Sequence, residues 1–293
     1  MRYAFYPGCT LHGTSKEYYE STRQVFRALG VELEEIRDWN CCGATALAAA
    51  SDLGSLVVPL RNLAIAEETK LELAVACNCC FMTLRRSLEA FRGDPARRAQ
   101  MESALAAVGR HFAGKVEVRH ILDILVNDVG LPEVERLAGD ALKNYKSVPY
   151  YGCQISRPKN PYFGTELPDQ LDDLLRAVGL DVPQFDRKTK CCGAALMTSH
   201  EGAALDLVAE ILDEAHRRGA DFITVTCPMC QLNVEAYQGK VNARHGTRHR
   251  IPVLYFTQVL GLAFDIAPLR LGLGRHMVSP KGLLVRRQKE AVQ

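Results

Sequence analysis

Apolar residues occur in short continuous runs at corresponding places in the two halves of the chain, and such runs predict buried strands. Between them lie longer stretches in which apolar residues recur every three or four positions. This alternation of strands with helices is typical of a mostly parallel sheet covered by helices. The predicted strands are 3–6, 71–76 and 116–118 in the first half and 148–151, 222–226 and 253–255 in the second.

The stretches with helical spacing predict helices between these strands. In the first of them, at 18–29, Thr14 and Glu17 predict a capping box at the start, and Gly30 predicts the end. A counterpart in the second half ends at Gly179. Further helices are predicted after Gly43 and Gly193, after the cysteine pairs described below, and at 121–126, 205–215 and 259–262.

The two halves therefore predict the same α/β unit twice, a small, mostly parallel sheet flanked by helices. We expect an N-terminal domain at 1–145, a C-terminal domain at 146–264 and a basic extension at 265–293. Pro268, Pro280 and a scarcity of apolar clusters predict that the extension leaves the second domain and orders against a partner. Its basic residues are Arg270, Arg275, Lys281, Arg286, Arg287 and Lys289.

Ten of the eleven cysteines fall into one pattern that occurs twice. Each copy has a single cysteine, then Cys-Cys-Gly, then two cysteines separated by two residues. The last four cysteines recur 150 residues later, and the first recurs 144 residues later. The first set is Cys9, Cys41, Cys42, Cys77 and Cys80, and the second set is Cys153, Cys191, Cys192, Cys227 and Cys230. Cysteine chemistry is therefore the centre of the functional prediction.

Three other uses of cysteine compete with an iron–sulfur cluster. Disulfide frameworks suit small secreted domains, but this chain has 293 residues, is 47% hydrophobic and shows no secretory signal in MRYAFYPGC. Structural zinc takes four ligands, usually from paired CxxC motifs, whereas each set here offers five cysteines. A thioredoxin-like CxxC pair does not explain the Cys-Cys-Gly motif. Adjacent thiolates diverge and suit different metals of one cluster, so we expect a cluster in at least one set, with zinc in one set as the alternative.

The predicted elements place the cysteines of each set together. Cys9 and Cys77, like Cys153 and Cys227, follow predicted strands, and ligands of parallel sheets gather beyond the carboxyl ends of the strands. The Cys-Cys-Gly and CxxC segments also open predicted helices. Free N–H groups and the positive end of the helix dipole favour an anionic group there, such as a thiolate-ligated cluster.

The pattern C-x31-CC-x34-CxxC, followed by C-x37-CC-x34-CxxC, in which Gly43 and Gly193 are the first residues after the adjacent cysteines, resembles the cysteine-rich CCG-domain family. The segments YPGCTLHG, CCGA and YYGCQISRP are similar to the B subunits of heterodisulfide reductase and of its bacterial relatives. The resemblance covers about residues 1–264. It implies that each complete set holds a noncubane [4Fe-4S] cluster, with its five cysteines as ligands and one of them bridging.

The resemblance also implies a function. In that family a disulfide binds between the two clusters, each cluster delivers one electron, and the clusters themselves are the catalytic groups. Electrons arrive from a small ferredoxin-like subunit with [4Fe-4S] clusters, and ultimately from a flavoprotein subunit. We therefore expect an oxidoreductase subunit that reduces or forms a sulfur–sulfur bond in a disulfide, a persulfide or a protein-bound dithiol. The second hypothesis is a CCG subunit of a succinate- or fumarate-reductase-like complex, with relay or structural metal sites.

Composition and motifs also limit which other molecules this chain is expected to bind. A net charge of +2 gives no strong attraction to nucleic acid, and no apolar run approaches a membrane span, so we expect a cytoplasmic protein. The segment 272–274 lacks the strand and helix of a dinucleotide site, which argues against bound flavin or nicotinamide. A basic stretch predicts either a solvated loop or a surface that attracts an acidic partner subunit or an anionic thiol substrate. It consists of Lys240, Arg244, His245, Arg248, His249 and Arg250.

Two further residues lie near the first set. Cys79 aligns with Met229 in the second copy, which predicts a small buried thiol outside the ligand set, with an alternative ligand or an oxidation-sensitive site as the other interpretations. His12 follows Cys9 by three residues but aligns with Ser156. Because five thiolates already suffice, we expect His12 to be a neighbour of the site or a surface residue.

Overall fold

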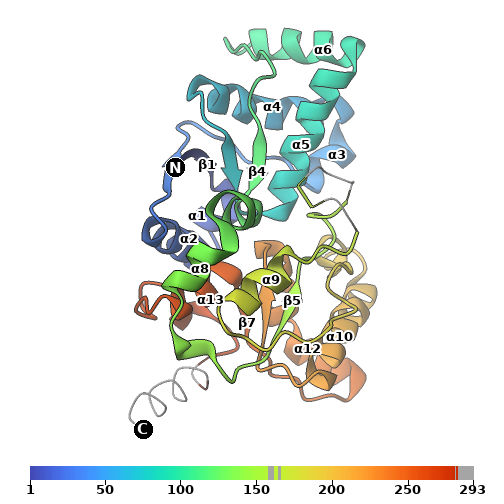
Figure 1. The fold of residues 1–293 in the computed structure, drawn as a ribbon. Helices are drawn as coiled ribbons and strands as arrows, with labels where there is room; N and C mark the ends of the chain where they lie inside the picture. The colour runs from blue at the N-terminus through green and yellow to red at the C-terminus, as the bar shows by residue number, and fades with distance from the viewer. Residues whose placement is uncertain (158–161, 164–165, 281, 283–293) are drawn as a thin grey trace.

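The fold contains two parallel sheets, one in each half of the chain, with helices around them (Figure 1). It is a computed structural model and describes residues 1–157, 162–163, 166–280 and 282. The strand order is β2-β1-β3-β4 in the first sheet and β5-β6-β7 in the second, and every pair is parallel. The strands are β1 (Arg2–Tyr6), β2 (Glu32–Glu35), β3 (Leu73–Val75), β4 (Val118–His120), β5 (Ser147–Tyr150), β6 (Phe222–Val225) and β7 (Val253–Tyr255). The predicted α/β class is confirmed.

The first sheet has an edge strand that the hydrophobic pattern does not predict. β2 carries three glutamates and buries only Leu33, so its apolar signal is weak. In the second half, a single parallel bridge between Lys146 and Asp181 lies beside β5 in the corresponding place. Both halves therefore share one strand order, as a repeated unit should. β4 begins two residues later than its predicted start at Val116.

The helices follow the predicted alternation and add α6, α8 and α12 to it. In the first half they are α1 (Gly8–His12), α2 (Lys16–Ala28), α3 (Ala46–Ala50), α4 (Asp52–Glu68), α5 (Asn78–Gly93), α6 (Pro95–Ala106), α7 (Ile121–Asp123), the π-helical η1 (Ile124–Gly130), α8 (Leu131–Leu137) and the 3-10 turn η2 (Asp140–Leu142). In the second half they are α9 (Gln170–Ala177), α10 (Glu201–Arg217), α11 (Pro228–Ala236), α12 (Gln238–His245), α13 (Phe256–Ala263) and the 3-10 turns η3 (Ala194–Leu196) and η4 (Leu273–Arg275).

The predicted capping box at the start of α2 is wrong. The N-cap is Ser15 rather than Thr14, and no side chain caps the helix. Glu17 is instead buried, with Gly272 of the C-terminal extension packed against it. The end of the helix is as predicted, since Gly30 adopts a φ of +66°, which suits glycine.

The two halves meet where their central strands end. Tyr18 of α2 stacks on Tyr255, with ring centroids 4.0 Å apart and planes 5° from parallel. The Tyr18 hydroxyl lies 3.0 Å from the carbonyl oxygen of Ala76 and 3.1 Å from that of Thr226, the residues that follow β3 and β6. The carboxyl ends of β3 and β6 are therefore brought together around one buried phenol group.

Each half also packs its last helices against the first long helix of the other half. α13 of the C-terminal half packs on α2, and α7 and α8 of the N-terminal half pack on α9 (Figure 1). α2 and α9 occupy corresponding places in the repeat, so the exchange is nearly symmetric. The expected boundary between residues 145 and 146 stays a prediction, but the helices on either side of it are interleaved.

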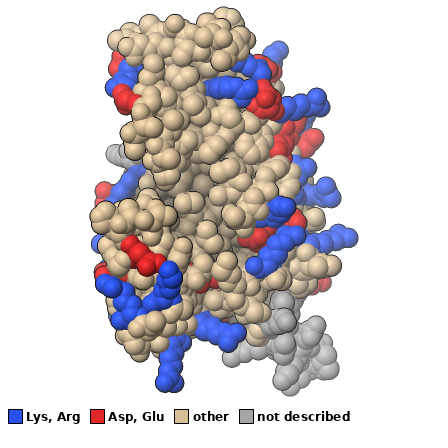
Figure 2. All heavy atoms as spheres, turned by 180° about the vertical axis from the view of Figure 1, so that it is seen from behind, with Lys and Arg blue, Asp and Glu red and all other residues tan. Residues whose placement is uncertain are grey.

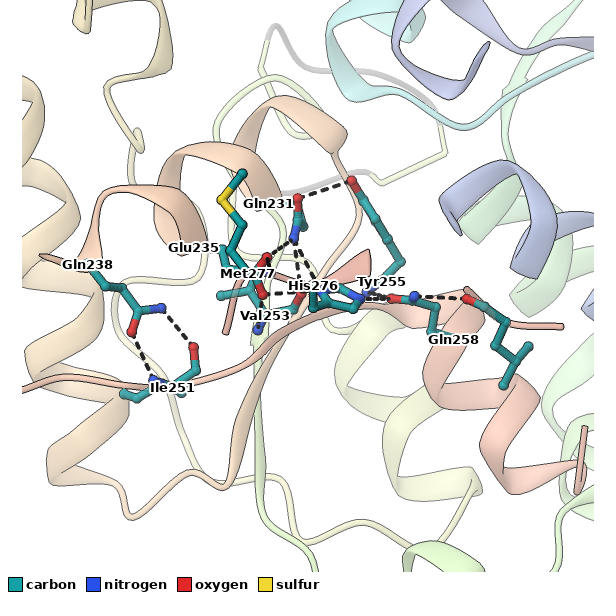
Figure 3. A network of polar contacts seen from close by, with 10 residues as sticks. Gln231, Glu235, Gln238, Ile251, Val253, Tyr255, Gln258, His276 and Met277 are labelled. Carbon is teal, nitrogen blue, oxygen red and sulfur yellow. Dashed lines mark hydrogen bonds and ion pairs between the residues drawn. The ribbon is translucent and has the colours of Figure 1, made fainter. Parts of the chain in front are cut away.

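The C-terminal extension does not leave the second domain as expected. Leu271 and Leu273 are buried, and Arg275 forms an ion pair of 2.5 Å with Glu20 of α2. His276 is enclosed by a polar network in the C-terminal half (Figure 3). Its ring nitrogens lie 3.1 Å from the Glu235 carboxylate and 3.0 Å from the Gln258 amide oxygen. The described part of the extension is thus fixed to both halves. Four of its predicted basic residues lie outside the described residues, namely Lys281, Arg286, Arg287 and Lys289.

The basic stretch is not simply a solvated loop, because its first part forms the end of α12. Lys240 pairs with Glu201, Arg244 with Asp206 at 2.7 Å, and His249 with Asp213 at 2.6 Å. All three acidic partners belong to α10. Figure 2 likewise shows basic and acidic side chains beside one another along the margins of one face, with a broad area without charge between them. Much of the positive charge is therefore neutralised within the chain.

We expect Tyr18→Phe to lower the free energy of unfolding by about 1–2 kcal/mol, because two buried carbonyl groups lose a hydrogen-bond donor. Urea unfolding followed by circular dichroism measures this change. Tyr237→Phe is the matched control, since Tyr237 is half-buried and its hydroxyl has no hydrogen bond among the described residues. Equal stability of the two variants would contradict the role given to the Tyr18 hydroxyl.

Candidate metal centres

The first set of cysteines gathers at the carboxyl end of the first sheet. Cys9 lies in α1 directly after β1, Cys41 and Cys42 follow β2, and Cys77 and Cys80 begin α5. The sulfur atoms of Cys9 and Cys41 are 3.8 Å apart, and those of Cys42 and Cys80 are 3.3 Å apart. Cys42, Cys77 and Cys80 are buried, whereas Cys9 and Cys41 are exposed. This group therefore has a buried side and a side open to solvent.

The second set repeats this arrangement. The sulfur atoms of Cys192 and Cys230 are 3.6 Å apart, Cys153 contacts Cys191, and Cys227 contacts Cys230. Cys192, Cys227 and Cys230 are buried, Cys191 is exposed and Cys153 is half-buried. The structure thus brings together the cysteines of each predicted set. Their role as metal ligands stays a prediction.

Backbone geometry makes both groups favourable for thiolates. Cys77 and Cys227 are the N-caps of α5 and α11, so their sulfurs lie at the positive ends of these helices. Backbone N–H groups of Gly43 and Gly193 donate to Cys41 at 3.5 Å and to Cys191 at 3.3 Å. These donors correspond in the two halves, as the repeat requires.

The pKa values of neighbouring sulfurs separate in opposite directions. Hydrogen bonding with Cys41 and Cys80 lowers the pKa of Cys42 to about 3, while hydrogen bonding with Cys42 raises the pKa of Cys80. In the second group, hydrogen bonding with Cys153 lowers the pKa of Cys191 to about 6. Hydrogen bonding with Cys230 lowers the pKa of Cys227 well below its ordinary value. Each group therefore contains sulfur that favours the metal-binding thiolate form.

Two buried tyrosines, which the sequence argument does not single out, fix the Cys-Cys-Gly loops. The Tyr6 hydroxyl donates to the Asn40 carbonyl at 2.8 Å, and the Tyr150 hydroxyl donates to the Lys190 carbonyl at 2.7 Å. Asn40 and Lys190 are the residues just before the two loops. The signal was present in the sequence, because each tyrosine stands three residues before the first cysteine of its set.

The two histidines near the cysteines have other partners. His12 pairs with Glu35 at 3.1 Å and is partly exposed, as expected for a neighbour or surface residue. His120, which the sequence argument does not mention, is completely buried and accepts a hydrogen bond from the Leu122 N–H. Its other ring nitrogen lies 3.2 Å from the Ala76 carbonyl. Burial lowers the pKa of His120 to about 4, so its ring is neutral at ordinary pH.

The two groups touch across the boundary between the halves. The sulfur atoms of Cys77, Cys79 and Cys227 all lie within 4.8 Å of one another. Cys77 and Cys227 belong to different sets, and Cys79 is the cysteine that the repeat leaves over. Alignment of the two copies cannot reveal this contact, because it compares equivalent positions and does not place the two halves in space.

The donor atoms fit an iron–sulfur cluster. Every group has five sulfur donors, one more than a closed tetrahedral zinc site takes, and the donors include an adjacent cysteine pair. A sulfur-only set with free N–H donors around it is the environment that such clusters require.

None of the helices in the described part of the chain combines the length and the apolar character of a membrane span.

Comparison with known proteins agrees with this geometry. The 8-methylmenaquinol:fumarate reductase membrane anchor subunit of Wolinella succinogenes is 30% identical over 278 residues, covering 94% of this chain and 96% of that protein. The B subunit of the ferredoxin:CoB-CoM heterodisulfide reductase of Methanosarcina mazei is 28% identical and covers 92% of each chain. A protein of Archaeoglobus profundus named as similar to the heterodisulfide reductase B subunit is 27% identical and covers 98% of each.

A solved structure shares the fold. The crystal structure of a hypothetical protein from Helicobacter pylori superposes with a TM-score of 0.71 at 17% identity. The match covers 95% of this chain and 52% of that one, so this chain spans about half of that structure.

The family described as the cysteine-rich domain, CCG, matches residues 3–85 and 148–235, which include all ten cysteines of the two sets. The chain therefore belongs to the cysteine-rich CCG domain family.

Proposed function

We propose that this chain is the iron–sulfur catalytic subunit of a heterodisulfide-reductase-like complex, with one noncubane [4Fe-4S] cluster in each five-cysteine group. The observation that carries the proposal is the meeting of two complete groups across one interface, through Cys77 and Cys227. The ligands are the ten cysteines of the two sets. Zinc in one group is the alternative for that group only.

The proposed reaction makes or breaks a sulfur–sulfur bond. Reduction of a disulfide takes two electrons and two protons and releases two thiols, and when bound the two clusters would supply these electrons one at a time. The chain holds the two groups adjacent and leaves one side of each open at Cys9, Cys41 and Cys191. The substrate would be a disulfide, a persulfide or a protein-bound dithiol, and the reverse direction forms the bond.

The proposed partners are those that the resemblance to heterodisulfide reductase implies. A small ferredoxin-like subunit with [4Fe-4S] clusters would exchange electrons with this chain, and a flavoprotein subunit would supply them. We propose that the complex acts in the cytoplasm. Relatives named as B subunits of heterodisulfide reductase support a place in a complex of this kind.

A second candidate function is favoured by one comparison. The relative at 30% identity is a fumarate reductase subunit, so this chain can instead serve a succinate- or fumarate-reductase-like complex with relay or structural metal sites. Purification of the native complex distinguishes the two. A covalent-flavin dicarboxylate dehydrogenase as partner supports the second function, and a heterodisulfide-reductase-type flavoprotein supports the first.

Metal analysis of the chain, purified without oxygen, tests the proposal. We expect about eight irons and as many acid-labile sulfides per chain, with EPR signals that disulfide or persulfide substrates perturb. One zinc without sulfide would overturn the catalytic proposal. About four irons and one zinc would show that the two groups differ in function.

We expect Cys42→Ser and Cys192→Ser each to remove one centre and leave the other assembled. The reason is that each cysteine contacts sulfur atoms of its own set only, Cys80 in one case and Cys230 in the other. Iron content should fall by about half in each variant. Loss of both centres from either substitution would contradict the assignment of two separate ligand sets.

Two glycines show how closely the chain approaches the sulfurs. Gly8 and Gly152 immediately precede the first cysteine of each set, and both have a positive φ, +72° and +71°. A Cβ atom at Gly8 would lie 3.1 Å from the Cys80 sulfur, and one at Gly152 would lie 2.8 Å from the Cys230 sulfur. The backbone conformation therefore favours glycine at both positions, and at Gly152 the Cys230 sulfur also leaves no room for a side chain.

We expect Gly152→Ala to remove or weaken the second centre and to leave the first intact, because the new methyl group displaces a ligand sulfur. Gly219→Ala is the matched control, since Gly219 has a φ of +68° but no atom within 4 Å of the added carbon. The control should lose about 1 kcal/mol of stability from its backbone conformation and keep all its iron. Equal iron loss in both variants would attribute the effect to backbone strain instead.

A further inference from the structure

Cys79 is the cysteine for which the repeat provides no role, yet it lies where the two groups meet. Its sulfur is within 4.8 Å of Cys77 in its own half and of Cys227 in the other half. It is in hydrogen-bonding contact with both of these sulfur atoms. The thiol is thus enclosed by predicted ligands from both sets and is only partly exposed.

Helix geometry explains why Cys79 turns toward the other half. It lies in the first turn of α5, immediately before Cys80. Successive side chains on an α-helix are separated by about 100° around the axis, because one turn takes 3.6 residues. Cys80 points to Cys42 of its own set. Cys79 therefore cannot point in that direction as well, and it faces Cys227.

The second half does not return this contact. The equivalent residue in its CxxC motif is Met229, which is half-buried. A thioether has no proton to lose and cannot become a thiolate. The two sets match in their ten cysteines but differ here, so only the first half adds an eleventh thiol to the contact between them.

The neighbouring residue holds this segment against the second half. Asn78 is completely buried, and its amide nitrogen donates to the Tyr151 carbonyl at 2.6 Å and to the Thr226 hydroxyl at 3.1 Å. Its amide oxygen has no hydrogen-bond donor among the described residues. An unpaired buried acceptor is unfavourable, so Asn78 offers this oxygen to a hydrogen-bond donor at the junction. These bonds of Asn78, the residue before Cys79, hold this segment beside the second set.

We propose that Cys79 is an additional thiolate ligand of the second metal centre, delivered across the interface by the first half. The inference rests on the proposed function, in which both groups are metal centres, and it replaces the expectation that Cys79 stands outside the ligand set. On binding metal, the Cys79 thiol releases its proton to solvent and its sulfur donates an electron pair to the metal. The second centre then draws ligands from both halves, whereas the first uses only its own.

The experiment separates the two centres before testing Cys79. Full-length chain carrying Cys42→Ser keeps only the second centre, and chain carrying Cys192→Ser keeps only the first. Cys79→Met, which introduces the residue found in the other half, and Cys79→Ser are added to each background. Iron, acid-labile sulfide, EPR spectra and the chelator concentration that strips the iron are measured without oxygen. Met229→Leu is the matched control for a change at the equivalent position.

With Cys42→Ser, we expect either Cys79 substitution to change the EPR spectrum of the second centre and to weaken its hold on metal about tenfold or more. With Cys192→Ser, the first centre should be unchanged, and Met229→Leu should alter neither. An unchanged second centre, or an altered first centre, would overturn the inference. Wild-type chain without iron and sulfide would instead overturn the proposed function, so the two failures are distinguishable. Circular dichroism confirms that each variant is folded.

Discussion

Tyr18 lies between the two halves, stacked on Tyr255, with its hydroxyl between the carbonyl groups that end β3 and β6. Parallel sheets gather their ligands at the carboxyl ends of strands, so the way these ends are placed decides where the chemistry occurs. Two sheets facing apart would give two distant sites. Here they face each other, and the sulfur atoms of Cys77 and Cys227 come within 4.8 Å. The positive ends of α5 and α11 meet at the same place and favour the negative charge that thiolates bring.

Much of this arrangement follows from the sequence. The repeated spacing of ten cysteines predicts two equal groups, and the alternation of strands with helices predicts their position beyond the strand ends. Local signals were less reliable. Glu17 predicts a capping box for α2, but no side chain caps the helix and Glu17 is buried against Gly272. β2 lacks the hydrophobic pattern of a buried strand, because this edge strand contains three glutamates and buries only Leu33.

The features that the sequence could not predict depend on contacts between distant segments. The extension is basic and poor in apolar clusters, yet Leu271, Leu273 and His276 are buried against the rest of the chain. An alignment of the repeats gives Cys79 no equivalent cysteine, and its contact with Cys227 becomes visible only when the two halves are placed in space. The basic stretch suggested a partner, but α10 supplies acidic residues to much of it. In each case at least one contacting residue is distant in the sequence, such as Glu235 for His276, Cys227 for Cys79 and Glu201 for Lys240.

Each half depends on the other to cover its first long helix. α13 covers α2, and α7 and α8 cover α9, so each unit is completed by the end of the other. Such reciprocal contacts are those of a two-fold dimer with swapped elements, joined here in one polypeptide. One copy of the unit by itself would leave its first long helix without this cover. Because both copies belong to one polypeptide, equivalent positions can carry different residues, and Cys79 in one copy with Met229 in the other is a difference that two identical chains cannot have.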